Sequence, residues 1–167
     1  GGKSPCIVGR GANVEIAARR TAWGKFINAG QTCVAPDYVF VHENQRAEFV
    51  EAVRLTVKRF YGDRPCDSPD YPRIVHREGT ERLANLIHAS GQVVFGGEVN
   101  VEERYIAPTV LIDVEADSLI MREEIFGPIL PVLTYREIDD VIRFVNKRDK
   151  PLALYYFGPK REAREVL

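Results

Sequence analysis

Short apolar runs alternate with amphipathic stretches along this chain, and the alternation limits the possible folds more than any other feature. Apolar runs typical of buried strands occur at residues 5–8, 38–41, 93–95, 109–112, 130–133 and 152–156. Apolar residues at helical spacing predict helices from Asn13 to Gly30 and at about 45–59, 78–89 and 138–146. Strands that alternate with helices favour an α/β fold with a mostly parallel sheet flanked by helices.

The first predicted helix carries clear local signals. Asn13 is a suitable N-cap, and Gly30 marks the end of the helical pattern. Ile16, Trp23 and Ile27 widen the apolar face of this helix. We therefore expect Trp23 to lie in the core.

Length and charge exclude several classes of function. The 167 residues are enough for one ordinary domain, and their net charge is −1. Acidic and basic residues are interspersed, so no surface for nucleic acid or an anionic membrane is predicted. No apolar run is long enough to span a bilayer, and no secretory signal pattern opens the sequence. These features favour a cytoplasmic protein with no membrane contact.

The cysteines and the two ends of the sequence add two expectations. Cys6, Cys33 and Cys66 are odd in number and lack metal-site spacing, which predicts a reduced intracellular protein without a bound metal. The sequence begins at Gly1 without a methionine and stops within a helical pattern. We therefore expect a piece of a longer protein.

Cys33 is the candidate nucleophile. It lies in a glycine-marked loop after an amphipathic helix, whereas Cys6 lies on an apolar strand and Cys66 in a proline-rich loop. A thiolate needs a partly exposed, electropositive setting, and free backbone N–H groups in such a loop can also bind an oxyanion. A loop cysteine taken alone is more often inert, and spacing alone does not decide between the two.

Two other motifs have a functional and a structural interpretation. Gly9-Arg10-Gly11 follows a strand and precedes a helix, but Val14 occupies the third glycine position of a dinucleotide fingerprint, which favours an ordinary turn. In residues 123–128, Glu-Glu-Ile-Phe-Gly-Pro, a carboxylate could accept ribose hydroxyls and the ring could support a flat heterocycle. Composition alone favours solvated glutamates and a core position for Phe126.

Three segments in order, residues 1–5, 28–33 and 123–128, resemble the NAD(P)-dependent aldehyde dehydrogenase superfamily. The resemblance covers essentially the whole chain. Residues 34–38, 73–75, 95–97 and 104–110 are most similar to its class 3 branch. The resemblance implies the catalytic-domain fold of that superfamily for residues 1–167, cut at both ends and without the coenzyme-binding domain.

The resemblance also implies roles for single residues. Cys33 would be the catalytic nucleophile, and its backbone N–H would form half of an oxyanion hole. Glu124 would bind the nicotinamide ribose hydroxyls, Phe126 would pack beside the nicotinamide ring, and Gly1 would border the nicotinamide pocket. The family's general-base glutamate and oxyanion-hole asparagine are missing from these residues.

The activity implied is oxidation of an aldehyde to a carboxylic acid with NAD or NADP, through a thioester on Cys33. The parent enzyme would be a homodimer, and these residues alone would be inactive. Two alternatives stay open: a dehydrogenase that passes the thioester to coenzyme A, and a noncatalytic fragment that serves as an interaction module.

Overall fold

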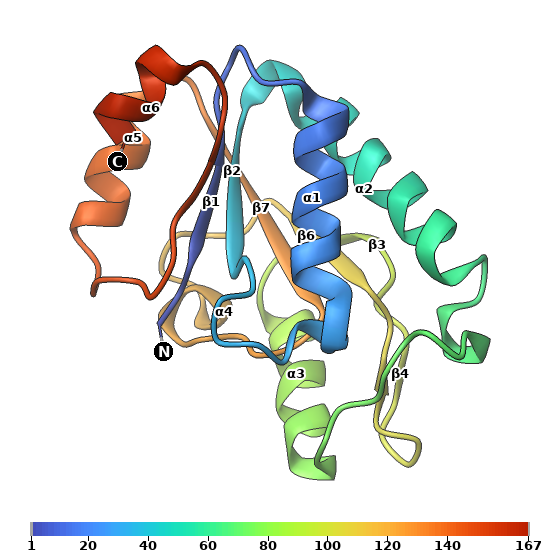
Figure 1. Ribbon diagram of the computed structural model, residues 1–167. Coiled ribbons are helices and arrows are strands. Elements are labelled where there is room, and N and C mark those ends of the chain that lie inside the picture. The colour runs from blue at the N-terminus through green and yellow to red at the C-terminus, as the bar shows by residue number, and fades with distance from the viewer. Residues whose placement is uncertain (1, 167) are drawn as a thin grey trace.

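A six-stranded sheet runs through the computed structural model of the chain, which describes residues 2–166 (Figure 1). The strand order is β3-β6-β7-β2-β1-β8, and every neighbouring pair is parallel except β3 and β6. The strands are β1 (Pro5–Val8), β2 (Tyr38–His42), β3 (Gln92–Phe95), β6 (Thr109–Ile112), β7 (Ile129–Tyr135) and β8 (Tyr155–Phe157). The prediction of a mostly parallel sheet is confirmed.

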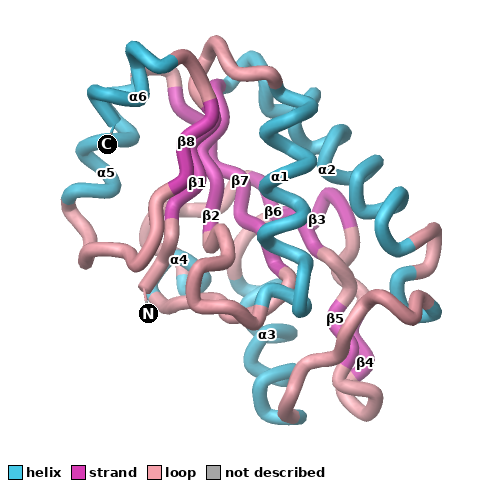
Figure 2. Tube along the Cα trace, viewed as in Figure 1, coloured by secondary structure: helices cyan, strands magenta, loops and turns pink. Residues whose placement is uncertain are grey.

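Helices flank the sheet on both faces. They are α1 (Val14–Phe26), α2 (Arg46–Tyr61), α3 (Arg77–Ala89), α4 (Leu119–Arg122), α5 (Ile138–Asn146) and α6 (Lys160–Val166), with 3-10 turns η1 (Ile27–Gly30), η2 (Glu43–Gln45) and η3 (Pro65–Asp67). Two short strands, β4 (Val99–Asn100) and β5 (Tyr105–Ile106), pair separately from the main sheet (Figure 2). Strands β4 and β5 and helix α4 were not predicted from the sequence.

Alternating side chains of β2 show how the two faces of the sheet form two cores. Val39 and Val41 pack in the cluster that includes Phe49 and Val53 of α2. Their neighbour Phe40 faces the opposite way and packs in the cluster that includes helices α3 and α5. Both faces are apolar because helices cover both, as expected for parallel strands.

The end of α1 leads directly into the loop that carries Cys33. The Asn13 side chain accepts a hydrogen bond from the Ile16 amide at 2.9 Å, so the predicted N-cap is present. The α-helix ends at Phe26, and Asn28, Ala29 and Gly30 then have positive φ angles of 54°, 50° and 70°. Three residues in the left-handed region reverse the chain toward the amino end of β2.

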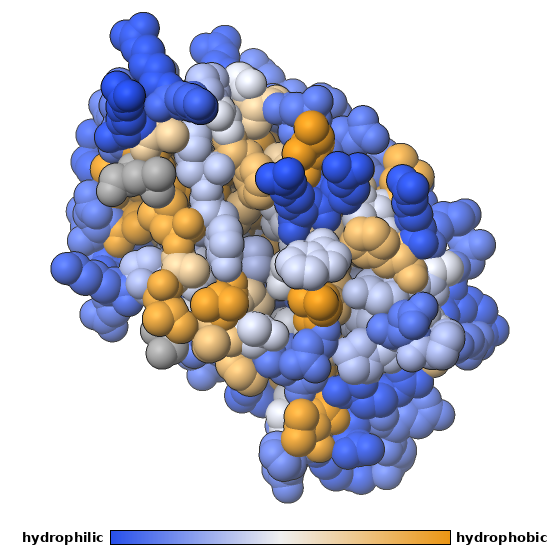
Figure 3. Space-filling model, viewed as in Figure 1, coloured by the Kyte–Doolittle hydropathy of each residue, from blue (hydrophilic) through white to orange (hydrophobic). Residues whose placement is uncertain are grey.

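The prediction that Trp23 lies in the core is wrong. Its side chain is 59% exposed, and Ile16 and Ile27 are also exposed. Figure 3 shows that apolar side chains reach the surface at several places on the face that it draws. Helix α1 instead packs through small residues, among them Ala18 and Ala22, which bring the helix close to the sheet. The periodicity identified the helix correctly but made its buried face too wide.

The last predicted strand is also corrected, since residues 152–154 are not part of β8. Within residues 2–166, no helix combines the length and the apolar character needed to cross a membrane.

Candidate active site

Three loops meet at the edge of the sheet where the parallel strands begin, the lower edge in Figure 1. Cys33 lies in the loop before β2, Glu124 and Phe126 lie in the segment before β7, and Lys3 lies just before β1. Because β1, β2 and β7 are adjacent parallel strands, the segments that precede them are adjacent too. Gly1, the remaining predicted site residue, lies outside the described residues.

Cys33 is exposed in a loop whose other groups are held in place. The Ala35 amide donates to the Thr32 carbonyl at 3.0 Å, which closes a tight turn around Cys33. The Tyr155 hydroxyl, from β8, donates to the Val34 carbonyl at 2.6 Å. Among the hydrogen bonds of residues 2–166, none uses the amide of Cys33. Both the thiol and the amide of Cys33 therefore remain available to a ligand.

The other two cysteines have different surroundings. Cys6 is fully buried on β1, its Sγ lies 3.4 Å from the Thr21 hydroxyl, and burial raises the pKa of the thiol to about 12. Cys66 is partly buried, with its Sγ 3.6 Å from a carboxylate oxygen of Asp67. Only the Cys33 thiol is both exposed and set at the edge where the three loops meet.

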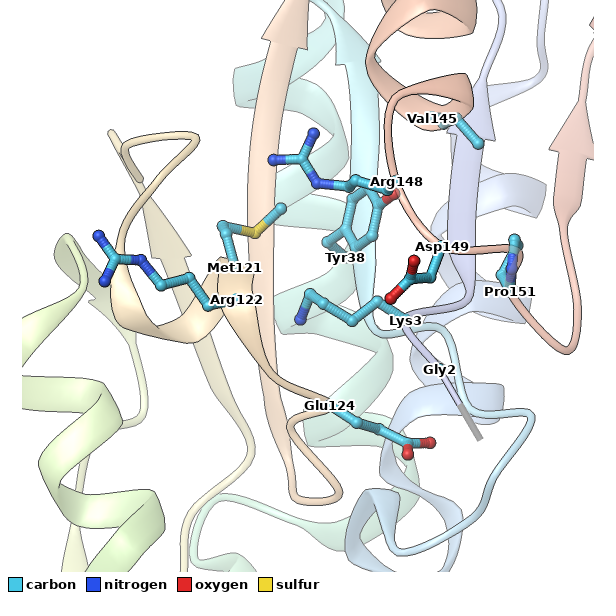
Figure 4. Close-up of a pocket in the computed structure, with 10 residues that line it drawn as sticks. All are labelled: Gly2, Lys3, Tyr38, Met121, Arg122, Glu124, Val145, Arg148, Asp149 and Pro151. Carbon is cyan, nitrogen blue, oxygen red and sulfur yellow. The ribbon is translucent and has the colours of Figure 1, made fainter.

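Glu124 lines a cavity of about 170 Å³ together with Gly2, Lys3, Tyr38 and Arg148 (Figure 4). The Glu124 carboxylate points away from the Lys3 ammonium (Figure 4). It is half-buried, and across residues 2–166 it has no hydrogen-bond or ion-pair partner. A preformed, unpaired carboxylate is suited to accept hydrogen bonds from ligand hydroxyls.

Phe126 follows two residues later in the same segment. Its ring is 44% exposed, and its φ angle of 52° lies in the left-handed region, which is uncommon for an aromatic residue. The interpretation of Phe126 as a core residue is therefore wrong. The ring is available to pack against a flat group.

The loops of Cys33 and Glu124 are in contact. A Cβ atom added to Gly30 would overlap the carbonyl oxygen of Gly127. In addition, the Asp37 carboxylate accepts a hydrogen bond from the Ile125 amide at 3.1 Å, through its Oδ1 atom. The structure thus brings together two segments that are distant in the sequence, since Asp37 and Ile125 are 88 residues apart.

Sequence reasoning missed a charged cluster beneath these loops. Asp37 is 3% exposed, and its Oδ2 atom lies 2.6 Å from the Lys3 ammonium. The Lys25 ammonium, which has no exposed surface, lies 3.8 Å from Asp37 Oδ1 and makes no hydrogen bond within residues 2–166. The sequence holds only a weak signal for this cluster, because charged residues beside a motif are usually solvated.

Burial dominates the titration of both lysines. It lowers the pKa of Lys25 from 10.5 to about 8, while Asp37 acts in the opposite direction and Lys3 adds to the lowering. Burial also lowers the pKa of Lys3, again opposed by Asp37. Within the described residues, no group of three or more His, Cys, Asp or Glu side chains could hold a metal ion.

Comparison with known proteins gives one consistent family. The sequence model described as "Aldehyde dehydrogenase family" matches residues 1–166. The chain is 50% identical to 4,4'-diaponeurosporen-aldehyde dehydrogenase of Staphylococcus aureus, over 99% of this chain and 36% of that protein. It is 48% identical to "Aldehyde dehydrogenase, dimeric NADP-preferring" of Mus musculus, over 95% of this chain and 35% of that protein.

Solved structures agree. The chain matches a structure described as "Substrate bound state of Staphylococcus Aureus AldH" with a TM-score of 0.97 and 48% identity. The match covers 99% of this chain and 37% of that one. The chain therefore spans about a third of the length of the relatives it matches.

Proposed function

The chain belongs to the aldehyde dehydrogenase family, and we propose that it forms the catalytic part of a longer enzyme that oxidises an aldehyde to a carboxylic acid. The observation that carries this proposal is the contact between the two loops. An exposed thiol, Cys33, and an unpaired carboxylate, Glu124, lie on segments that touch at one edge of the sheet. The family relationship supports the reaction class.

Cys33 begins the proposed reaction as a nucleophile. Its thiolate attacks the aldehyde carbon, and the carbonyl oxygen becomes an oxyanion that accepts a hydrogen bond from the Cys33 amide. A nicotinamide coenzyme bound beside Cys33 would supply the hydride acceptor for the tetrahedral adduct. The product on the protein is a thioester at Cys33, and attack by water on its carbonyl releases the acid and restores the thiol.

The described residues fit one end of that coenzyme. The Glu124 carboxylate has free lone pairs for two ribose hydroxyls, and Phe126 offers an exposed ring on the same segment. The Mus musculus relative is named as NADP-preferring. We propose that Glu124 and Phe126 hold the nicotinamide end of NAD or NADP, as the resemblance of residues 123–128 implies.

A general base for the hydrolysis is not among the site residues described above. We propose that the longer enzyme supplies it, with the coenzyme-binding domain and the asparagine of the oxyanion hole. The 167-residue chain alone should then form no NADH from an aldehyde and NAD. NADH formation by the purified chain above that of a Cys33→Ser control would contradict this proposal.

Substitutions in the longer enzyme test the two main roles separately. Cys33→Ala should abolish aldehyde oxidation. Glu124→Gln should raise the KM for the coenzyme about tenfold or more, because hydrogen bonds to a charged acceptor contribute about 1.5–3 kcal/mol. Steady-state kinetics with a varied coenzyme concentration measures both. Full activity of Cys33→Ala would disprove the assignment of the nucleophile.

Product analysis completes the test. With coenzyme A present, the proposed enzyme should still release free acid. Accumulation of acyl-coenzyme A instead would show that a thiol, and not water, accepts the acyl group from Cys33.

We propose a homodimer for the longer enzyme. The support is the name of the Mus musculus relative, which describes that protein as dimeric. Light scattering coupled to size exclusion should give twice the mass of one chain, and a monomer mass at micromolar concentration would contradict the proposal.

A further inference from the structure

The backbone on both sides of Glu124 is held by side chains from other parts of the chain. On one side, the Glu123 carbonyl accepts a hydrogen bond from the Lys3 ammonium at 2.8 Å. On the other, the Ile125 amide donates to Asp37 at 3.1 Å, and the Ile125 carbonyl accepts from the guanidinium of Arg82 at 2.5 Å. The main chain around Glu124 is fixed, whereas its carboxylate is left unpaired.

Asp37 connects this segment to the nucleophile. It lies four residues after Cys33 in the same loop, and its amide donates to the Ser4 carbonyl at 2.8 Å. One carboxylate oxygen binds Lys3 and the other binds the Ile125 amide. A single side chain therefore joins the loop of Cys33, the segment before β1 and the segment of Glu124.

The charges around Asp37 favour one fixed arrangement. A buried carboxylate is costly unless counter-ions and hydrogen bonds compensate it. Lys3, at 2.6 Å, gives direct compensation, and its ammonium also donates to the Ile120 carbonyl at 2.7 Å. Lys25, at 3.8 Å, adds a second buried positive charge on the opposite oxygen. Moving the Glu124 segment would break several charge-assisted hydrogen bonds at once.

Arg82 acts on the same segment from helix α3. Its guanidinium lies 3.4 Å from the Glu123 carboxylate, in addition to its hydrogen bond to the Ile125 carbonyl. The Glu123 side chain, the carboxylate that pairs with Arg82, is 47% exposed, so replacing Arg82 leaves no buried charge without a partner. It therefore offers a way to loosen the Glu124 segment without disturbing the core.

We propose that Asp37 and Arg82 are positioning residues that hold the main chain of Ile125 from two sides and so aim the Glu124 carboxylate before the coenzyme binds. This inference rests on the proposed function of Glu124. Neither residue touches the ligand in this account. Their effect on the coenzyme passes through Glu124, and it vanishes when Glu124 cannot act.

A double-mutant cycle in the longer enzyme tests the inference. Asp37→Asn keeps the size of the side chain but removes its charge, and we expect it to raise the KM for the coenzyme about tenfold. Arg82→Met should raise the same KM about threefold. In the background of Glu124→Gln, each substitution should raise the KM less than twofold further, because the positioned group is already disabled.

Asp113→Asn is the matched control for Asp37→Asn. Asp113 pairs with Arg46 at 3.0 Å on the surface, and both side chains are largely exposed. This variant should leave the coenzyme KM unchanged. Alkylation of Cys33 by iodoacetamide without coenzyme should stay within twofold of the wild-type rate in Arg82→Met, which shows that the nucleophile loop is intact.

The outcomes are distinct. Additive effects with Glu124→Gln, or a KM changed less than twofold by Arg82→Met and by any folded Asp37→Asn protein, would overturn the inference while the proposed function stands. If Asp37→Asn does not fold, Arg82→Met and its cycle decide alone. Full activity of Cys33→Ala would contradict the proposed function and this inference with it.

Discussion

Gly30 packs against Gly127 so closely that a Cβ atom on Gly30 would overlap the carbonyl oxygen of Gly127. Gly30 also has a φ angle of +70°, in the region that only glycine adopts without strain. The loop of Cys33 and the segment of Glu124 can therefore approach each other only because no side chain stands between them. This close approach is what makes one site out of two distant segments.

Replacing Gly30 tests that contact. Gly30→Ala should lower the free energy of unfolding by about 2–5 kcal/mol, because it combines left-handed backbone strain with overpacking. Gly62→Ala is the control, since Gly62 also has a positive φ of 81° but no atom within 4 Å of an added Cβ. The control should cost only about 1–2 kcal/mol. Equal losses in urea unfolding would contradict the tight contact.

The buried Lys25 predicts a pH-dependent stability. Asp37, Lys3 and Glu124 are the charged groups that act on it, and burial lowers its pKa from 10.5 to about 8. Between these values the unfolded chain binds a proton at Lys25 that the folded chain does not, so stability rises with pH. Wild type should therefore gain up to about 3 kcal/mol relative to Lys25→Met as the pH rises through this window.

Lys58→Met is the control for that experiment. Lys58 pairs with Asp63 at 2.7 Å, and both side chains are largely exposed. The stability difference between wild type and this variant should stay nearly constant from pH 8 to about pH 10. If urea unfolding shows that the stability difference between wild type and Lys25→Met also stays constant with pH, the lowered pKa of the buried Lys25 is contradicted.

Alkylation ranks the three cysteines. Iodoacetamide reacts with thiolates that it can reach, so Cys33 should react at least about tenfold faster than Cys6, whose pKa burial raises to about 12. Cys66 should react at an intermediate rate. Peptide mapping by mass spectrometry gives each rate, with Cys33→Ser as the control. A Cys33 rate no higher than that of Cys66 would favour the noncatalytic alternative.

The sequence predicted the architecture well because most elements bury a simple periodic pattern. Phe49, Val53 and Val57 recur at helical spacing in α2, and all three are fully buried as that spacing requires. Trp23 is exposed although it follows the helical spacing, because α1 packs on the sheet through alanines. A periodic pattern does not show how wide the buried face of a helix is. Strands β4 and β5, with two residues each, are too short to give a pattern.

The site was only partly predictable. Cys33, Glu124 and Phe126 were found through motifs, and their roles stay predictions until the substitutions are made. The cluster of Lys3, Asp37 and Lys25 could not be derived, because no local pattern distinguishes a buried ion pair across 34 residues from solvated surface charges. Such pairs arise from the order of strands in the sheet, which periodicity does not give.

The most direct test of this account is the identity of the acylated residue during turnover. The longer enzyme, quenched while it oxidises an aldehyde and digested, should show the mass of one acyl group on the peptide that contains Cys33. Cys33→Ala should show no adduct and no product. An acyl group found on Cys6, Cys66 or any other residue, or turnover by Cys33→Ala, would contradict the central claim.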